Sequence, residues 1–224
     1  MKVAALILTM FLAAVSAAGQ VTTNKNDIPE SQYLAAEAKA AELLKTANYR
    51  SRWVKSYLED NLMATFLQEM VTREVIRPNK WRTITVKLYE NPPVREEIIA
   101  DGKDFYFRTD NGPWTKGGLG SGSGGVIETG QVKNQFRYLP AINYGGKKVN
   151  LYEKISVRTA NKLSQTDLVV VRYIRTTRIW YSLDGKILQK IEETRVEGSK
   201  EMLRETTTYE YDPKDLKIEA PVIK

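Results

Sequence analysis

The spacing of apolar residues separates one predicted helix from a long series of predicted strands. Between residues 31 and 45 the apolar side chains recur three or four positions apart, which places them on one face of a helix. They are Tyr33, Ala36, Ala40, Leu43 and Leu44. The segment before them is typical of a helix start, with Asp27 as the predicted cap and Pro29 in the first turn. Because this face carries small residues, we expect the helix to lie close against a sheet.

Beyond Tyr49 apolar and polar residues alternate, which is the period of half-buried strands. The alternation is clearest in segments 84–88, 149–158 and 203–211. Turn sequences separate the runs: Asp101-Gly102, Gly145-Gly146, Asp184-Gly185 and Gly198-Ser199. The runs follow one another too closely for crossover helices, so the sheet is predicted to be antiparallel. A sheet of long strands and short turns must curl or be covered to bury one face.

Two segments allow more than one interpretation. Apolar residues four positions apart between Val54 and Met70 suit a helix, but the same stretch also fits two strands, 49–58 and 65–76, around residues 59–61. Frequent Thr, Val and aromatic residues favour the hairpin. Segment 167–181 does not alternate cleanly, which indicates a strand that is buried on both faces or carries a bulge.

The N-terminal residues have the layout of a secretory signal peptide. Lys2 is followed by 13 uncharged, mostly apolar residues and then by small residues up to Gly19. A run of 13 is shorter than the roughly 20 residues that a membrane-spanning helix needs. We therefore predict a signal peptide at 1–19 and a single exported domain at 20–224, in a bacterial periplasm or secreted.

Segment 112–130 differs from the rest because it holds eight of the 14 glycines. Its Gly/Ser composition predicts a flexible loop within the domain. Residues 120–125 match G-x-G-x-x-G formally. Dinucleotide binding needs that motif between a strand and a helix, and no helix pattern follows here, so the loop interpretation is favoured.

Composition excludes several kinds of chemistry. The 224 residues include 34 Lys and Arg, 27 Asp and Glu, and neither His nor Cys, with a net charge of +7. Zinc sites built on His or Cys, Ser-His and Cys-His nucleophiles, thiol redox centres and disulfides are therefore excluded. The basic residues are interspersed with acids, which predicts a solvated surface of mixed charge rather than a nucleic-acid site.

Paired carboxylates are the remaining candidates for catalysis, as in a glycoside hydrolase. Glu96-Glu97 and Glu192-Glu193 are adjacent pairs, but neighbours in a strand point to opposite faces. We therefore expect most of these acids to be solvated charges and the protein not to be an enzyme.

Three C-terminal segments carry a family resemblance. YSLDGKIL at 181–188, TTTYEYDP at 206–213 and LKIEAP at 216–221 resemble the C-terminal hairpin of exported bacterial proteins of the outer-membrane lipoprotein carrier (LolA) and LppX-like superfamily. Segment 104–125, with its NGPWTKGG, resembles exported proteins of similar type. The resemblance implies a mainly β fold, a strongly curved antiparallel sheet forming a half-open barrel. An N-terminal helix would cover an apolar cavity that holds acyl chains of lipids or lipoproteins.

The sequence therefore predicts an exported, non-enzymatic carrier or binding protein for lipid-like or lipoprotein acyl chains, without a cofactor or metal. The alternative is an envelope interaction or scaffold module with a filled core that binds a partner by strand addition. The expected partners are a lipid or acylated protein and, transiently, a membrane surface, but not nucleic acid, and the chain is expected to be a monomer. The candidate ligand-binding residues are Trp53, Phe66, Met70, Ile84, Val86, Phe105, Phe107, Leu151, Ile155, Trp180 and Tyr209, with Trp114 as a possible gate.

Overall fold

A computed structural model describes residues 25–59, 64–117, 131–164 and 167–223. Within these residues it contains one helix and eleven strands. The elements are α2 (Glu30–Thr46), β1 (Tyr49–Glu59), β2 (Ala64–Ile76), β3 (Lys80–Lys87), β4 (Val94–Asp101), β5 (Asp104–Thr109), β6 (Thr115–Lys116), β7 (Gln131–Tyr144), β8 (Lys147–Ser164), β9 (Asp167–Ser182), β10 (Ile187–Val196) and β11 (Glu201–Tyr211). The predicted helix is confirmed, and segment 49–76 is the predicted hairpin, so the helical alternative there was wrong. The predicted signal peptide and most of the Gly/Ser-rich loop lie outside the described residues.

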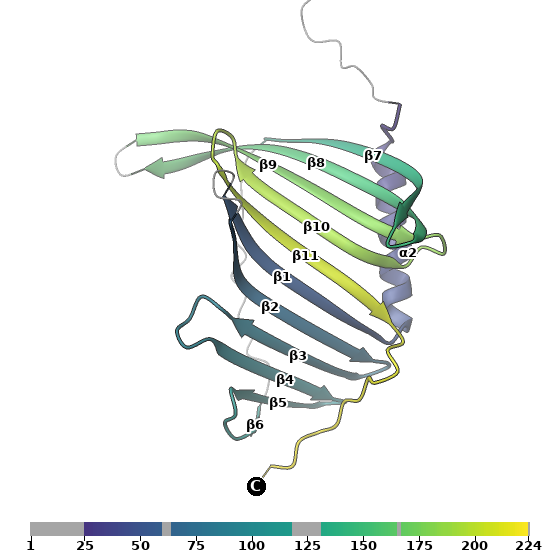
Figure 1. The fold of residues 1–224 in the computed structure, drawn as a ribbon, viewed down its shortest axis with the longest axis vertical. Coiled ribbons are helices and arrows are strands. Elements are labelled where there is room, and N and C mark those ends of the chain that lie inside the picture. The colour runs from purple at the N-terminus through teal and green to yellow at the C-terminus, as the bar shows by residue number, and fades with distance from the viewer. Residues whose placement is uncertain (1–24, 60–63, 118–130, 165–166, 224) are drawn as a thin grey trace, which may run out of the picture.

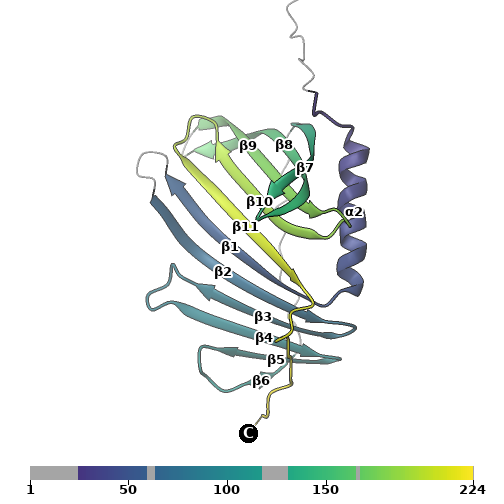
Figure 2. The ribbon, with the colours of Figure 1, turned by 45° about the vertical axis from the view of Figure 1, so that its right-hand side comes forward.

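All eleven strands form one antiparallel sheet, in the order β6-β5-β4-β3-β2-β1-β11-β10-β9-β8-β7. Strands β1 to β6 run outward from the centre to one edge, and β7 to β11 return from the other edge. The two meanders meet where β1 pairs with β11. The sheet is curved and not closed, and α2 lies against one side of it (Figures 1 and 2). The predicted half-open barrel with a covering helix is confirmed.

The helix packs on the sheet near the β7 edge. Tyr33 and Ala40 of α2 form a buried cluster with sheet residues Phe136, Ile179 and Tyr181. The ring centroids of Tyr33 and Phe136 are 5.1 Å apart. Small residues along α2 allow this close approach, as the sequence pattern predicted.

The predicted cap of the helix was wrong. Pro29 occupies the N-cap position, and no side chain caps the helix there. Asp27 instead reaches the sheet, where its Oδ1 accepts a hydrogen bond of 3.1 Å from Gln135 Nε2. The backbone beside it also pairs with the β7 edge, through Ile28 N to Phe136 O at 3.0 Å. Asp27 therefore helps fix the chain entering the helix to the sheet.

Strand β9 explains why segment 167–181 does not alternate. Its pairing with β8 is continuous from Asp167 to Ser182, and the register shift against β10 lies between Ile187 and Gln189. Ile179 is buried under α2 on one face, whereas Trp180 stacks on Tyr144 on the other, with ring centroids 5.7 Å apart. The strand is thus covered on both faces near its C-terminal end, but Val170 is 65% exposed, so the prediction of a strand buried on both faces does not hold along its whole length.

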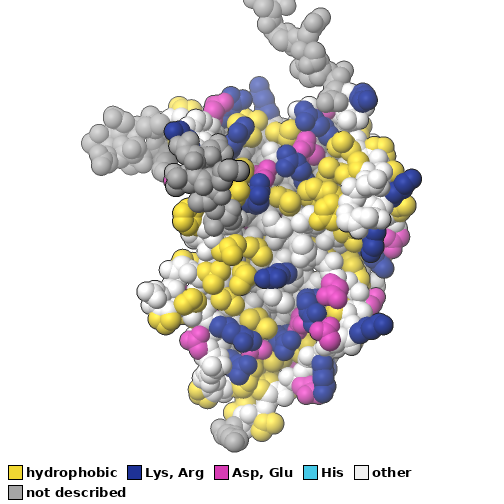
Figure 3. Space-filling view, viewed as in Figure 1, with side chains coloured by type: hydrophobic (Ala, Val, Ile, Leu, Met, Phe, Trp, Pro, Cys, Tyr) yellow, Lys and Arg dark blue, Asp and Glu magenta, His cyan; other side chains and the backbone are white. Residues whose placement is uncertain are grey.

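Cross-strand partners share a face, so the register divides the strand residues into two sets. We call the set that contains Phe136, Tyr152 and Ile179, packed with α2, the helix face. The opposite set is the charged face. Figure 3 shows it, since α2 lies behind the sheet in that view, and Lys, Arg, Asp and Glu side chains are interspersed there with apolar ones.

Two ladders of alternating arginine and glutamate cross the charged face. The first ladder has one residue on each of β1 to β5: Arg50, Glu74, Arg82, Glu97 and Arg108. The second ladder has one on each of β7 to β11: Arg137, Glu153, Arg178, Glu193 and Arg204. Within each ladder, consecutive side chains are 2.5–4.0 Å apart.

These ladders correct the prediction of solvated acids. Glu74 and Glu97 are each only 3% exposed. Glu96 and Glu97 do point to opposite faces of the sheet. Glu96 forms an ion pair with Lys87 on the helix face, and Glu97 forms one with Arg108 on the charged face. Glu97 is therefore a buried structural anion rather than a solvated one.

The turn at Gly185 gives a testable consequence of the close approach of α2. Gly185 has a φ of +97°, and a Cβ placed there would lie 2.8 Å from Lys39 Cε. We expect Gly185→Ala to lower the free energy of unfolding by about 1–2 kcal/mol, because the backbone conformation disfavours a side chain. Urea unfolding measures this loss. Adding Lys39→Ala to Gly185→Ala should recover only the part of the lost stability that comes from the contact between the new Cβ and Lys39. An unchanged urea midpoint in Gly185→Ala would contradict the turn geometry.

Candidate functional site

The twelve candidate residues do not share one face of the sheet. The register places five on the helix face: Trp53, Phe66, Phe105, Phe107 and Tyr209. Six lie on the charged face: Met70, Ile84, Val86, Leu151, Ile155 and Trp180. The twelfth, Trp114, follows β5. Its ring lies under the guanidinium of Arg108, and the Arg108 Cζ atom is 4.5 Å from the ring centroid. As ligand-binding residues they remain predictions, but they cannot line a single cavity.

Three of the charged-face candidates do come together. Met70, Ile84 and Val86 line an open pocket of about 280 Å³ across β1, β2 and β3, together with Arg50, Arg52 and Thr72. Met70 pairs directly with Val86, and Thr72 with Ile84. We call this the Met70 pocket. Its volume lies near the lower end of the range of small-molecule sites, about 300 Å³.

The two arginines of the Met70 pocket have different surroundings. Arg50 donates to Glu74 Oε1 at 2.8 Å, to Asp215 Oδ2 at 2.9 Å and to Glu210 Oε2 at 3.3 Å. Hydrogen bonds to Asp215 and Glu74 raise the pKa of Arg50 above its ordinary value, so its charge is permanent and already compensated.

Arg52 lies beside Arg50 but is exposed and has no such compensation. Its Nη2 is 3.5 Å from Met70 Sδ, and a thioether is a weak acceptor. Its cross-strand partners, Thr72 and Thr208, are uncharged. Within the described residues no carboxylate forms an ion pair with Arg52. The Met70 pocket therefore combines apolar side chains with one uncompensated guanidinium.

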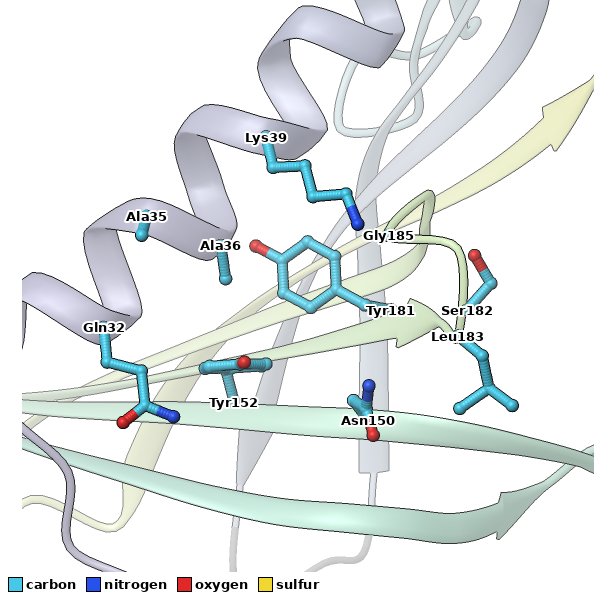
Figure 4. Close-up of a pocket in the computed structure, with 10 residues that line it drawn as sticks. All are labelled: Gln32, Ala35, Ala36, Lys39, Asn150, Tyr152, Tyr181, Ser182, Leu183 and Gly185. Carbon is cyan, nitrogen blue, oxygen red and sulfur yellow. The ribbon is translucent and has the colours of Figure 1, made fainter.

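A second pocket, of about 290 Å³, opens between α2 and the β9–β10 turn (Figure 4). Lys39 extends from α2 toward Gly185, with the Tyr181 ring beside it. The residues lining it are Gln32, Ala35, Ala36, Lys39, Asn150, Tyr152, Tyr181, Ser182, Leu183 and Gly185. None of them was a candidate from the sequence, because their proximity depends on where the helix docks. The small residues Ala35 and Ala36 were the available signal.

Burial keeps the tyrosines under α2 protonated. Burial raises the pKa of both Tyr33 and Tyr181 well above the ordinary value of 10.0, and the Tyr33 hydroxyl also donates to Glu37. Burial likewise raises the pKa of Tyr211 to about 12. Among the described residues, the Tyr181 hydroxyl is buried without a hydrogen-bond partner. These phenols are therefore uncharged near neutral pH.

This burial predicts a loss of stability in alkali. As pH rises above about 10, the unfolded chain releases phenol protons that the folded protein keeps, so the unfolded state is favoured. For Tyr33 and Tyr181 we expect about 1.4 kcal/mol of lost stability per pH unit each. Urea unfolding between about pH 9 and pH 11 measures the slope. Tyr181→Phe should reduce it and Tyr89→Phe, at an exposed position, should not; equal slopes in all three proteins would contradict the prediction.

Among the described residues, no group of three or more Asp or Glu side chains is placed to hold a metal ion. In the same residues, α2 is neither long nor apolar enough to cross a membrane. No protein-family model matches the sequence, and no curated protein is found to be similar to it. A function for this chain is therefore inferred from the geometry of its pockets.

Proposed function

We propose that this protein is an exported, non-enzymatic binding protein or carrier for lipid-like molecules, which holds an acyl chain in the Met70 pocket. The observation that carries the proposal is the grouping of Met70, Ile84 and Val86 along one open pocket. Each methylene buried against such side chains contributes about 0.8 kcal/mol of binding free energy. The family resemblance of the C-terminal segments implies the same class of ligand, although it would place the acyl chain under the N-terminal helix, whereas the Met70 pocket lies on the opposite face.

The alternative, a scaffold that binds by strand addition, has less support. Strand β7 is one edge of the sheet, and part of that edge is already paired with the segment before α2. Phe136 O accepts from Ile28 N, and Tyr138 N donates to Asn26 O at 2.9 Å. A strand added at this part of the β7 edge would have to displace this pairing.

The first experiment is native mass spectrometry of protein purified gently from the exported fraction, with organic extraction of any bound molecule. A co-purifying mass of lipid size would support the carrier. An unliganded protein that takes up neither added phospholipid nor lipopeptide would overturn it.

A double variant and a control test whether the ligand binds in the Met70 pocket. Ile84→Thr with Val86→Thr keeps β-branched side chains but adds two hydroxyls to the pocket. We expect about tenfold weaker binding of dodecan-1-ol by calorimetry, because about 1.4 kcal/mol of apolar contact is lost. Val196→Thr, at the exposed end of β10, is the control and should leave the affinity unchanged. If the control and the double variant bind dodecan-1-ol with equal affinity, the acyl chain of the ligand does not occupy the Met70 pocket.

A further inference from the structure

We propose that the ligand of the Met70 pocket is a long-chain carboxylate and that Arg52 binds its headgroup. This inference rests on the proposed function, because it names the chemical class of the ligand held there. Three observations support it. Arg52 has no ion pair among the described residues, it lies beside apolar side chains, and the charged residues around it already form ion pairs with one another.

The charge of Arg52 contrasts with the ladders on the same face. Every ladder arginine has a carboxylate oxygen within 3.5 Å. Arg52 lies one row from Arg50, between Thr72 and Thr208, and no described carboxylate reaches it. An anion that binds Arg52 would therefore not have to displace an existing ion pair.

The position of Arg52 fits an amphiphile rather than a small ion. Its guanidinium is 3.5 Å from Met70 Sδ, and Met70 lies beside Val86 in the pocket. An acyl chain against Met70, Ile84 and Val86 would place its headgroup beside Arg52. The planar guanidinium donates two parallel hydrogen bonds to a carboxylate, which a single ammonium cannot do.

The neighbouring charges disfavour a ligand with more than one negative charge. Glu74 is shared by Arg50 and Arg82, at 2.8 and 2.5 Å, and Glu210 and Asp215 are bound by Arg50. Each of these acids has an arginine partner, but the three carboxylates outnumber the two guanidinium groups of Arg50 and Arg82, so they would repel a second negative charge on a headgroup. Arg52 is then the one guanidinium of the pocket without an ion pair among the described residues, and its surroundings carry no surplus of positive charge, which suits a carboxylate better than a doubly charged phosphate.

The test compares three probes at pH 8, below micellar concentration, by calorimetry on the full exported protein. They are dodecanoate, dodecan-1-ol of the same chain length, and acetate, which has the headgroup alone. We expect dodecanoate to bind at least tenfold more tightly than dodecan-1-ol, and acetate not to bind measurably.

The variant Arg52→Gln should remove that preference. It should weaken dodecanoate binding at least tenfold and dodecan-1-ol binding far less, and Arg52→Lys should restore the preference only in part. Arg195→Gln is the matched control, because Arg195 is exposed on the same face but lies on β10, away from the pocket.

The outcomes separate the two proposals. If dodecanoate and dodecan-1-ol bind equally and Arg52→Gln changes neither, the headgroup assignment is overturned while the proposed function stands. If neither long-chain probe binds, the proposed function fails. If acetate binds as tightly as dodecanoate, Arg52 belongs to a site for small anions and the carboxylate amphiphile is rejected.

Discussion

Replacing Glu97 by alanine should lower the free energy of unfolding by about 3–5 kcal/mol. Glu97 is 3% exposed, and its Oε2 accepts from Arg108 Nη2 at 2.6 Å and from Arg95 Nη2 at 3.4 Å. A third guanidinium, that of Arg82, lies 4.0 Å from Oε1. Without the carboxylate, the guanidinium groups of Arg108 and Arg95 face each other around a void, and among the described contacts only Arg82 keeps another acid, Glu74 at 2.5 Å. Urea unfolding followed by circular dichroism measures the loss.

The adjacent residue provides the control for this experiment. Glu96 has a similar contact with Lys87, at 2.6 Å, but its side chain is 42% exposed and points to the helix face. Glu96→Ala should therefore cost less than about 1 kcal/mol. Glu97→Gln, which keeps the size and one acceptor but loses the charge, should fall between the two alanine variants. If Glu96→Ala and Glu97→Ala lowered the free energy of unfolding equally, burial of the first ladder would not determine how much it contributes to stability.

Tyr33→Ala should also cost about 3–5 kcal/mol, and it should release the helix from the sheet. Tyr33 is 2% exposed, and its ring lies 5.1 Å from that of Phe136 and 6.3 Å from that of Tyr152. Removing it leaves a void at the centre of the cluster through which α2 contacts β7, β8 and β9. Urea unfolding gives the free energy, and amide hydrogen exchange of α2 reports its release.

Two further variants separate the ring from its hydroxyl and from the helix itself. Tyr33→Phe keeps the ring contacts and loses only the bond to Glu37, so it should cost about 0.5–1.5 kcal/mol. Leu34→Ala changes the neighbouring residue, which is 51% exposed, and should alter stability by less than about 0.5 kcal/mol. If α2 amides stay protected in Tyr33→Ala, the helix is held by contacts other than this cluster.

Local pattern was sufficient to predict the helix, the 49–76 hairpin and the four turns, because each depends on residues close in sequence. The glycines at those turns indeed have positive φ, for example +68° at Gly102. Asp27 was assigned as a cap because it precedes Pro29. Its actual partner, Gln135, is 108 positions away, and no local pattern indicates such a contact.

The candidate site was harder to predict because it depends on register. Alternation shows that Trp53 and Val54 point to opposite faces, but not which of them shares a face with Met70 on the next strand. The pairing of Val54 with Met70, and the bulge between Lys55 and Ser56, decide this. For the same reason the uncompensated charge of Arg52 was not visible in the sequence, because only the register shows that the residues opposite it are Thr72 and Thr208.

The two ladders also have a consequence for how the sheet would come apart. Both follow the order Arg-Glu-Arg-Glu-Arg along the chain, and Arg50 precedes Trp53 by three residues as Arg204 precedes its partner Thr207. A half-turn about the Trp53–Thr207 pair therefore brings Arg50 and Arg204 into equivalent positions. The further rungs do not coincide, because Glu74 lies opposite Arg82 whereas Glu193 lies opposite Thr176. The β1–β11 interface is thus a seam between two leaves of the sheet, β1–β6 and β7–β11. Across the seam between the leaves, Arg204 faces Ser56, and Arg50 meets the exposed Glu210. The eleven backbone pairs of β1 with β11 span that seam without a buried arginine–glutamate rung among the described contacts. A force applied to the two sheet edges loads every strand interface in series. The seam, with eleven backbone pairs, is therefore expected to outlast the shorter β4–β5 interface, which has six.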